Sequence, residues 1–166
     1  MTEPVAPRTL PVIFVDGDAC PVREEVYRVA TRTGLDVRVV TNGSRPIRPP
    51  GLPNVSVVIV SDGMDAADDW IVVEIGANDI CVTGDIPLAS RCLGKGAFAL
   101  GFTGKQFTPD NIGAALAGRD LSRHLRELGL SQGGGKPMDK ADRSQFLNML
   151  DSLVVKAKRA KLRESA

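Results

Sequence analysis

Histidine, tryptophan and tyrosine each occur only once in this sequence of 166 residues. A single histidine excludes a zinc enzyme with several imidazole ligands, and a Ser-His-Asp site would have to depend on His124 alone. Because His124 lies in a polar helical pattern typical of an exposed surface, we assign it no catalytic role. The scarcity of tyrosine and tryptophan also gives little support for a surface that stacks nucleic-acid bases on aromatic rings.

Cysteine is scarce as well, and its spacing indicates neither a disulfide framework nor a thiolate zinc site. Cys20, Cys81 and Cys92 are odd in number and form no C-x-x-C pair. Such thiols are typical of a reducing compartment, so we expect a cytoplasmic protein. No apolar run approaches the roughly 18 residues of a membrane span, and we expect no membrane partner.

Neither sign of charge is in excess. The chain has 21 Lys and Arg against 20 Asp and Glu, for a formal net charge of +1. An overall basic field therefore cannot attract nucleic acid, and any such attraction must be local. The mass of 17.7 kDa, with 43% hydrophobic and 25% charged residues, indicates one globular domain and excludes a disordered or fibrous chain.

Short apolar runs alternate with helical patterns over the first two-thirds of the chain. The run over residues 12–15 is apolar on both faces, as expected for a central strand of a parallel sheet. The alternation predicts β-α-β units with helices on both faces of the sheet. We predict a three-layer α/β/α fold of Rossmann-like topology with a mostly parallel five-stranded sheet, the strands lying over residues 12–15, 37–40, 55–60, 80–83 and 97–102.

The helices between these strands are predicted over residues 21–34, 66–76 and 86–93. Beyond residue 103 we predict two C-terminal helices, one over residues 110–129 that is broken or bent near Gly118, and one over residues 140–159.

The domain organisation follows from these elements. A single domain that includes the C-terminal helices is predicted to span residues 11–155, after an irregular lead over residues 1–10 with no signal-peptide core. Residues 156–166 are rich in lysine and arginine and are expected to form a frayed tail.

Aspartates follow three of the predicted strands. Asp16 and Asp18 follow the first strand, Asp62 and Asp65 the third, and Asp85 the fourth. Because the carboxyl ends of parallel strands meet at one edge of the sheet, we expect these side chains to converge there. Clustered carboxylates raise one another's pKa, and a hard cation such as Mg²⁺ or Mn²⁺ relieves their repulsion. The pattern predicts an acidic metal site that binds phosphate-containing substrates.

Each of these acids also has a structural interpretation. Aspartate is common in turns and at helix N-caps, so Asp18 could belong to a turn and Asp85 could cap the following helix. Asp68 and Asp69 could be solvated helical residues. Asp65 and Asp69 are four residues apart, which would place both on one face of a helix. Three clusters after three separate strands favour the functional interpretation.

Three segments resemble motifs of the YaiI/YqxD family: VDGDACP over residues 15–21, DAADDWIV over residues 65–72 and VTGDIPLA over residues 82–89. The segment GGGKP over residues 133–137, followed by Asp142, Arg143 and Phe146, extends the resemblance, which covers residues 11–153.

That family in turn resembles PIN-like and NYN ribonuclease domains. The resemblance implies that Asp16, Asp65 or Asp69, and Asp85 are catalytic, and that Asp16, Asp65 and Asp85 hold Mg²⁺ or Mn²⁺ ions that activate water against a phosphodiester such as RNA. PIN-like domains often carry a further acid after the fifth strand, whereas residues 101–105 read GFTGK here. This departure bears on occupancy by a second metal.

Five further residues are candidates for substrate binding: Asp18, Thr83, Arg45, Lys136 and Arg143. The hydroxyl of Thr83 could bind metal or phosphate, although strand-end turns use threonine anyway. Lys136 and Arg143 flank a glycine-rich segment of a kind that approaches phosphate closely, and that equally serves as a linker. Arg45 lies on a loop rich in proline and glycine, where a solvated side chain is the alternative.

Two other functions remain open. The Asp16-Gly17-Asp18 run fits the D-x-D pattern of phosphatases that resemble the haloacid dehalogenase superfamily, with Asp16 as nucleophile and Asp18 as acid-base. The missing acid after the fifth strand would also suit a non-catalytic module that binds RNA or nucleotides. We favour a PIN-like ribonuclease or related phosphodiesterase; the oligomeric state stays open.

Overall fold

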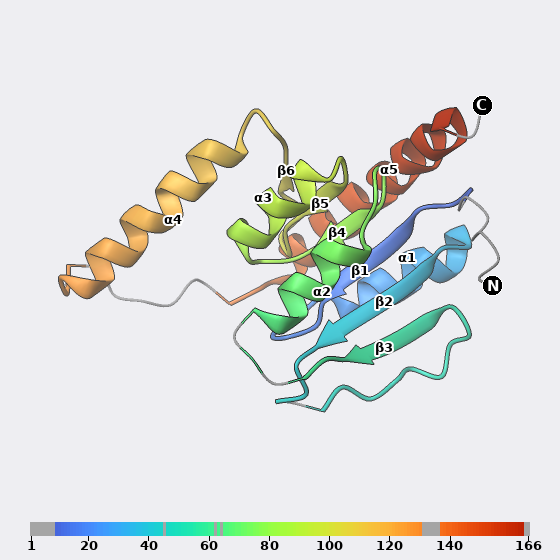
Figure 1. Ribbon diagram of the computed structural model, residues 1–166, viewed down its shortest axis with the longest axis horizontal. Helices are drawn as coiled ribbons and strands as arrows, with labels where there is room; N and C mark the ends of the chain where they lie inside the picture. The colour runs from blue at the N-terminus through green and yellow to red at the C-terminus, as the bar shows by residue number, and fades with distance from the viewer. Residues whose placement is uncertain (1–8, 45, 62, 64, 131–136, 165–166) are drawn as a thin grey trace, which may run out of the picture.

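The computed structural model describes residues 9–44, 46–61, 63, 65–130 and 137–164. Its centre is one six-stranded sheet (Figure 1) in the order β3-β2-β1-β4-β5-β6. The strands are β1 (Val12–Asp16), β2 (Asp36–Thr41), β3 (Val55–Ile59), β4 (Ile80–Val82), β5 (Phe98–Leu100) and β6 (Gln106–Phe107).

Strands β1 to β5 are parallel, which confirms the predicted mostly parallel sheet. The sixth strand is an addition. It pairs antiparallel with β5 after a tight turn, in which the N–H of Gly101 donates to the carbonyl of Lys105. Because β6 has only two residues, it carries no alternation that a sequence pattern could reveal.

Helices cover both faces of the sheet, which confirms the three layers (Figure 1). On one face, α1 (Arg23–Thr33) and α5 (Lys140–Glu164) pack on the side chains of Ile13 and Val15. On the other face, α2 (Ala66–Glu74) and α3 (Ile86–Gly94) pack on Val12 and Phe14. The apolar run of β1 is therefore buried on both sides, as its sequence predicts.

Helix α4 (Ile112–Glu127) projects away from this body (Figure 1). Only its beginning packs, through Ile112 and Ala115, against a small cluster that includes Ala89 of α3 and Phe107 of β6. None of its residues is fully buried. The helix is continuous through Gly118, so the prediction of a break there is wrong.

Helix α5 extends to Glu164, so residues 156–164 are helical and do not form a frayed tail. The reason is that this part of the helix also packs on the body, where Ala157 and Lys161 are buried. The Nζ of Lys161 lies 3.4 Å from Oδ1 of Asp79, a fully buried carboxylate just before β4. Asp79 also accepts hydrogen bonds from the backbone N–H groups of Val12 and Gly76.

Two properties of the described residues bear on the environment of the protein. None of their helices is both long and apolar enough to cross a membrane. The three cysteines, Cys20, Cys81 and Cys92, are buried free thiols.

Candidate functional site

A pocket of about 860 Å³ opens at the carboxyl end of the sheet, beside the ends of β1 and β4. In the order 3-2-1-4-5 the chain reverses direction across the sheet between these two strands, and such switch points are where open α/β sheets bind ligands. Five carboxylates line the pocket: Asp16, Asp18, Asp65, Asp68 and Asp85. Among its described lining residues there is no lysine, arginine or histidine.

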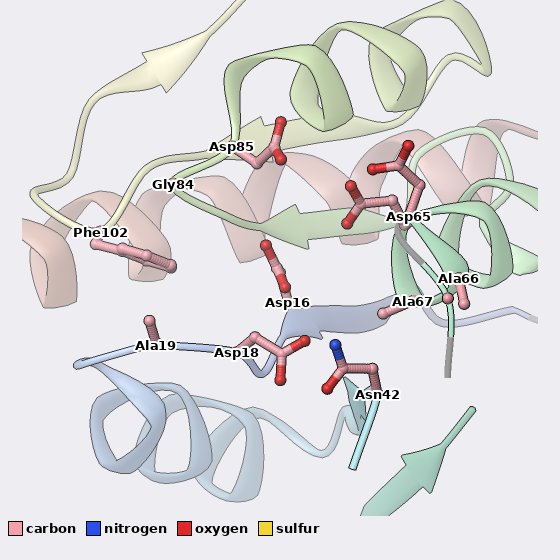
Figure 2. Close-up of a pocket in the computed structure, with 12 residues that line it drawn as sticks. Asp16, Asp18, Ala19, Asn42, Asp65, Ala66, Ala67, Gly84, Asp85 and Phe102 are labelled. Atoms are coloured by element: carbon pink, nitrogen blue, oxygen red, sulfur yellow. The ribbon is translucent and has the colours of Figure 1, made fainter. Parts of the chain in front are cut away.

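Asp16 is the last residue of β1 and lies at the centre of the group, between Asp85 and Asp18 (Figure 2). Its Oδ2 accepts a hydrogen bond of 2.9 Å from the hydroxyl of Thr83. Burial raises the pKa of Asp16, and the negative charges of Asp18 and Asp85 raise it further, whereas the Thr83 hydrogen bond lowers it. Asp16 is therefore a desolvated carboxylate under repulsion from its neighbours.

Asp85 is both a helix cap and a member of the pocket. Its Oδ1 accepts a hydrogen bond of 3.0 Å from the N–H of Leu88, which confirms the predicted N-cap of α3. Its own N–H donates to the hydroxyl oxygen of Thr83 at 2.9 Å. The cap and this second bond hold Asp85 beside Asp16, so the structural and the functional interpretation of Asp85 are compatible.

Asp18 is held by the neighbouring strand β2. The hydroxyl of Thr41, the last residue of β2, donates to Oδ1 of Asp18 at 2.7 Å. The turn between Asp16 and Asp18 is tight, since a Cβ on Gly17 would lie 2.9 Å from the carbonyl oxygen of Val40. Glycine is therefore required there, and it sets the positions of the two flanking acids.

On α2 the structure departs from the sequence-based choice of acids. Asp65 is the residue before the helix and has a left-handed backbone (φ 69°). Asp65 and Asp68, which lies in the first turn of α2, both line the pocket. Burial and the charges of Asp16, Asp85 and Asp65 raise the pKa of Asp68 to about 6. Asp69 lies outside the pocket lining and forms an exposed ion pair of 2.8 Å with Arg91.

The four-residue spacing favoured Asp69 because it assumed that Asp65 is helical. Since Asp65 is the residue before the helix, its side chain does not share the helical face that this spacing predicts. The neighbouring Asp68 enters the pocket instead. Asp65 makes no side-chain capping hydrogen bond, and its left-handed backbone has no signal in the sequence pattern.

The other predicted site residues lie in different places. Thr83 is fully buried and bridges Asp16 and Asp85. Arg143 does not line the pocket, and its guanidinium donates to the carbonyl oxygen of Pro21 and to Glu25 at the start of α1. Arg45, Lys136 and Asp62 lie outside the described residues.

Two residues of the pocket had no signal in the sequence. Asn42 follows β2, and Phe102 follows β5. The Phe102 ring lies over Gly84, where a Cβ would come within 2.8 Å of it. Figure 2 shows Phe102 and Asn42 on different sides of the acids, so the pocket has one aromatic wall, and the rest of its non-acidic lining consists of Asn42 and small residues.

The carboxylates do not form a closed metal cage. Within the described part of the chain, no three His, Cys, Asp or Glu side chains are grouped closely enough to hold a metal ion together. Tight tetrahedral coordination of the kind found in structural zinc sites is thus absent from these residues. The pocket is an open arrangement of carboxylates, in which Asp16 and Asp85 are joined through Thr83 and Asp18 is held by Thr41.

The fold and the pocket define an α/β protein with an acidic site at the switch point of a parallel sheet. Residues 14–156 match the family described as "Uncharacterized BCR, YaiI/YqxD family". A UPF0178 protein of Parvibaculum lavamentivorans is 55% identical over 142 residues, which cover 86% of this chain and 92% of the relative. A UPF0178 protein of Rhodospirillum rubrum is 52% identical over 149 residues, covering 90% of this chain and 99% of the relative.

The chain therefore belongs to the YaiI/YqxD family, as its motifs predict. No solved structure matches it. The likeness to PIN-like nucleases accordingly stays a prediction from the motifs.

Proposed function

We propose that this protein is a phosphodiesterase of the PIN-like type that depends on a divalent cation, with RNA as its substrate. The observation that carries this proposal is the convergence of five carboxylates on one pocket without a described basic residue in the lining. Partly buried acids under mutual repulsion are a costly arrangement for a fold, and a bound cation lowers that cost. Such perturbed acids in a pocket are a common sign of a functional site.

The donor set suits Mg²⁺ or Mn²⁺. Both prefer carboxylate oxygens, and Mg²⁺ is commonly bound through one or two carboxylates, several waters and the phosphates of its substrate. An open site therefore needs no group of three protein ligands. Asp16 and Asp85 would hold the cation directly, and Asp65, which precedes α2 and lines the same pocket, would contact its bound waters. A cation bound there would neutralise the phosphodiester and lower the pKa of a bound water.

The chain's own residues supply the rest of the chemistry. Thr83 orients Asp16 and Asp85 through its two hydrogen bonds. Asp68, whose pKa is raised to about 6, is suited to accept a proton near neutral pH, as a general base must. Asp18, held by Thr41, lies on the β2 side of the pocket and would position a substrate hydroxyl or a water.

Calorimetric titration with Mn²⁺ tests the cation site. We expect Asp16→Asn and Asp85→Asn to reduce Mn²⁺ affinity at least about tenfold, because each removes a charged ligand. Asparagine remains a good N-cap, so Asp85→Asn should keep α3 intact. Asp36→Asn is the matched control, since this exposed acid lies at the other end of the sheet, at the start of β2. Unchanged Mn²⁺ affinity in both pocket variants would contradict the proposal.

Cleavage assays separate the remaining alternatives. Hydrolysis of single-stranded RNA that requires Mn²⁺ and is lost in Asp16→Asn is the expected result. Cation binding without cleavage of RNA or DNA would favour the non-catalytic binding module. A covalent phosphate trapped on Asp16 would favour the phosphatase alternative, in which Asp16 attacks phosphorus directly.

A further inference from the structure

A second cleft, of about 550 Å³, lies between the projecting helix α4 and the body of the protein. One wall consists of residues of α4, including Arg119, Ser122 and Arg126. The other includes Ile86, the first residue of α3, and Lys105, in the turn between β5 and β6. We name it the α4 groove.

The α4 groove is basic. Lys105, Arg119 and Arg126 are exposed cations that line it, and none of its described lining residues is acidic. No carboxylate among the described residues forms an ion pair with Lys105 or Arg126, and the Nζ of Lys105 lies 5.9 Å from the centre of the Phe107 ring. Arg119 has a single, largely exposed contact of 3.7 Å with its neighbour Asp120. A solvated contact of this kind binds weakly and leaves the guanidinium available to a ligand.

The α4 groove lies beside the acidic pocket. Asp85 lines the pocket and the next residue, Ile86, lines the groove. The β5–β6 turn repeats this relationship, since Phe102 lines the pocket and Lys105 the groove, and the turn is closed by the bond between Gly101 and Lys105. Two short segments of the chain therefore contribute residues both to the acidic pocket and to the basic groove.

The small residues of α4 keep the groove open. Ala114, Ala115 and Gly118 line its floor, and nothing lies within 4 Å of a Cβ placed on Gly118. The cations stand on either side of this floor, on α4 and on the β5–β6 turn. Arg119 and Arg126 are seven residues apart on α4, about 10 Å along the helix axis, which suits the successive negative charges of an extended chain better than one compact anion.

We infer that the α4 groove binds the sugar-phosphate backbone of a single-stranded polynucleotide that extends from the acidic pocket. This inference rests on the proposed function and deepens it: the substrate is a polymer, held beside the scissile bond by Lys105, Arg119 and Arg126. Contacts to phosphate carry no base readout, so RNA and DNA share this chemistry and the sequence preference is weak.

The test measures binding without turnover. Fluorescence anisotropy with labelled oligouridine and oligothymidine of about 12 nucleotides, in EDTA and over a series of salt concentrations, gives the affinity and its salt dependence. The full-length protein is compared with a variant that combines Lys105→Ala, Arg119→Ala and Arg126→Ala. The matched control combines Arg28→Ala, Arg159→Ala and Arg163→Ala, three exposed cations of α1 and α5, so that the net charge is the same in both variants.

The expected result is a loss of affinity of at least about tenfold in the groove variant, with a salt dependence shallower by about 2 in log-log slope, since three phosphate contacts are removed. The control should lose much less. Equal losses in the two variants, or no binding by the wild-type protein, would overturn the inference.

The binding measurement requires no cleavage of the oligonucleotide, so failure of the groove inference can be distinguished from failure of the proposed function. A protein that binds the oligonucleotide through the groove and never cleaves it would contradict the proposed function and support the groove. If the protein cleaves RNA with Mn²⁺ but the groove and control variants bind RNA equally well, the proposed function is supported and the groove inference is contradicted.

Discussion

The hydroxyl of Thr83 donates a hydrogen bond of 2.9 Å to Oδ2 of Asp16, and this bond joins the carboxyl ends of the two central strands, β4 and β1. The same hydroxyl oxygen accepts from the backbone of Asp85. One buried threonine thus sets the distance between the two acids at the switch point of the sheet. Burial raises the pKa of Asp16, and the hydrogen bond from Thr83 lowers it.

Replacing this hydroxyl should change the titration of the site. In Thr83→Val the Asp16 carboxylate loses the hydrogen bond that lowers its pKa, so we expect the pH midpoint of Mn²⁺ binding to move upward. The measurement is Mn²⁺ affinity by calorimetry between about pH 5 and pH 8. Thr83→Ser keeps the hydroxyl and serves as the control. Superimposable pH profiles for the two variants would contradict this role of Thr83.

The two adjacent acids of α2 should differ in their effect on cation binding. Asp68 lines the pocket and Asp69 pairs with Arg91 outside it. We expect Asp68→Asn to weaken Mn²⁺ binding several-fold, because it removes one negative charge from the group. Asp69→Asn should leave Mn²⁺ affinity within a factor of about two, since its charge is exposed and already paired. A larger effect from Asp69→Asn would restore the sequence-based choice.

The difference between Asp68 and Asp69 illustrates what the sequence could predict. Strands apolar on both faces and aspartates after strands 1, 3 and 4 are local signals, and they were sufficient for the parallel sheet and for the edge where the acids meet. Which acid of α2 enters the pocket depends on one left-handed backbone angle at Asp65, and no side-chain pattern reports it.

Tertiary contacts account for the other differences. The extension of α5 to Glu164 depends on the buried Asp79, which is distant in sequence. Phe102 enters the pocket because Gly84 leaves space for its ring, a pairing between two different turns. The α4 groove depends on the direction in which α4 leaves the body, and the apolar pattern of a single helix does not encode this direction.

The raised pKa of Asp68 predicts a stability that depends on pH. The folded protein holds this proton up to about pH 6, whereas an ordinary aspartate releases it near 3.8, so the folded state binds more protons between these values. The stabilising contribution is therefore present below about pH 4 and is lost as the pH rises through 6.

Asp68→Asn removes this loss. Relative to wild type, we expect the variant to be more stable at about pH 7 by about 1 kcal/mol, a modest value because the group is half-exposed and screened by solvent, and to show no gain near pH 4. Urea unfolding at both pH values measures this difference. Added Mn²⁺ should reverse the order at neutral pH, since the wild type then gains more from the cation than the variant does. A difference in stability that is the same at both pH values would contradict the assignment.

The pair formed by Lys161 and Asp79 predicts a stability effect that leaves the site intact. Lys161→Met keeps the length of the side chain and removes the charge, so that the fully buried Asp79 loses its cation 3.4 Å away. Because the charge of the buried carboxylate is then less well compensated, we expect unfolding to become easier by about 3 kcal/mol. The control is Arg163→Met, at an exposed position two residues further along α5, which should lower the free energy of unfolding by less than about 0.5 kcal/mol.

The same variant tests whether the two ends of the sheet are independent. Asp79 lies before β4, at the end of the sheet opposite the pocket, so the folded Lys161→Met variant should bind Mn²⁺ with the affinity of the wild type. Weaker Mn²⁺ binding by this variant would show that the two ends of the sheet are linked.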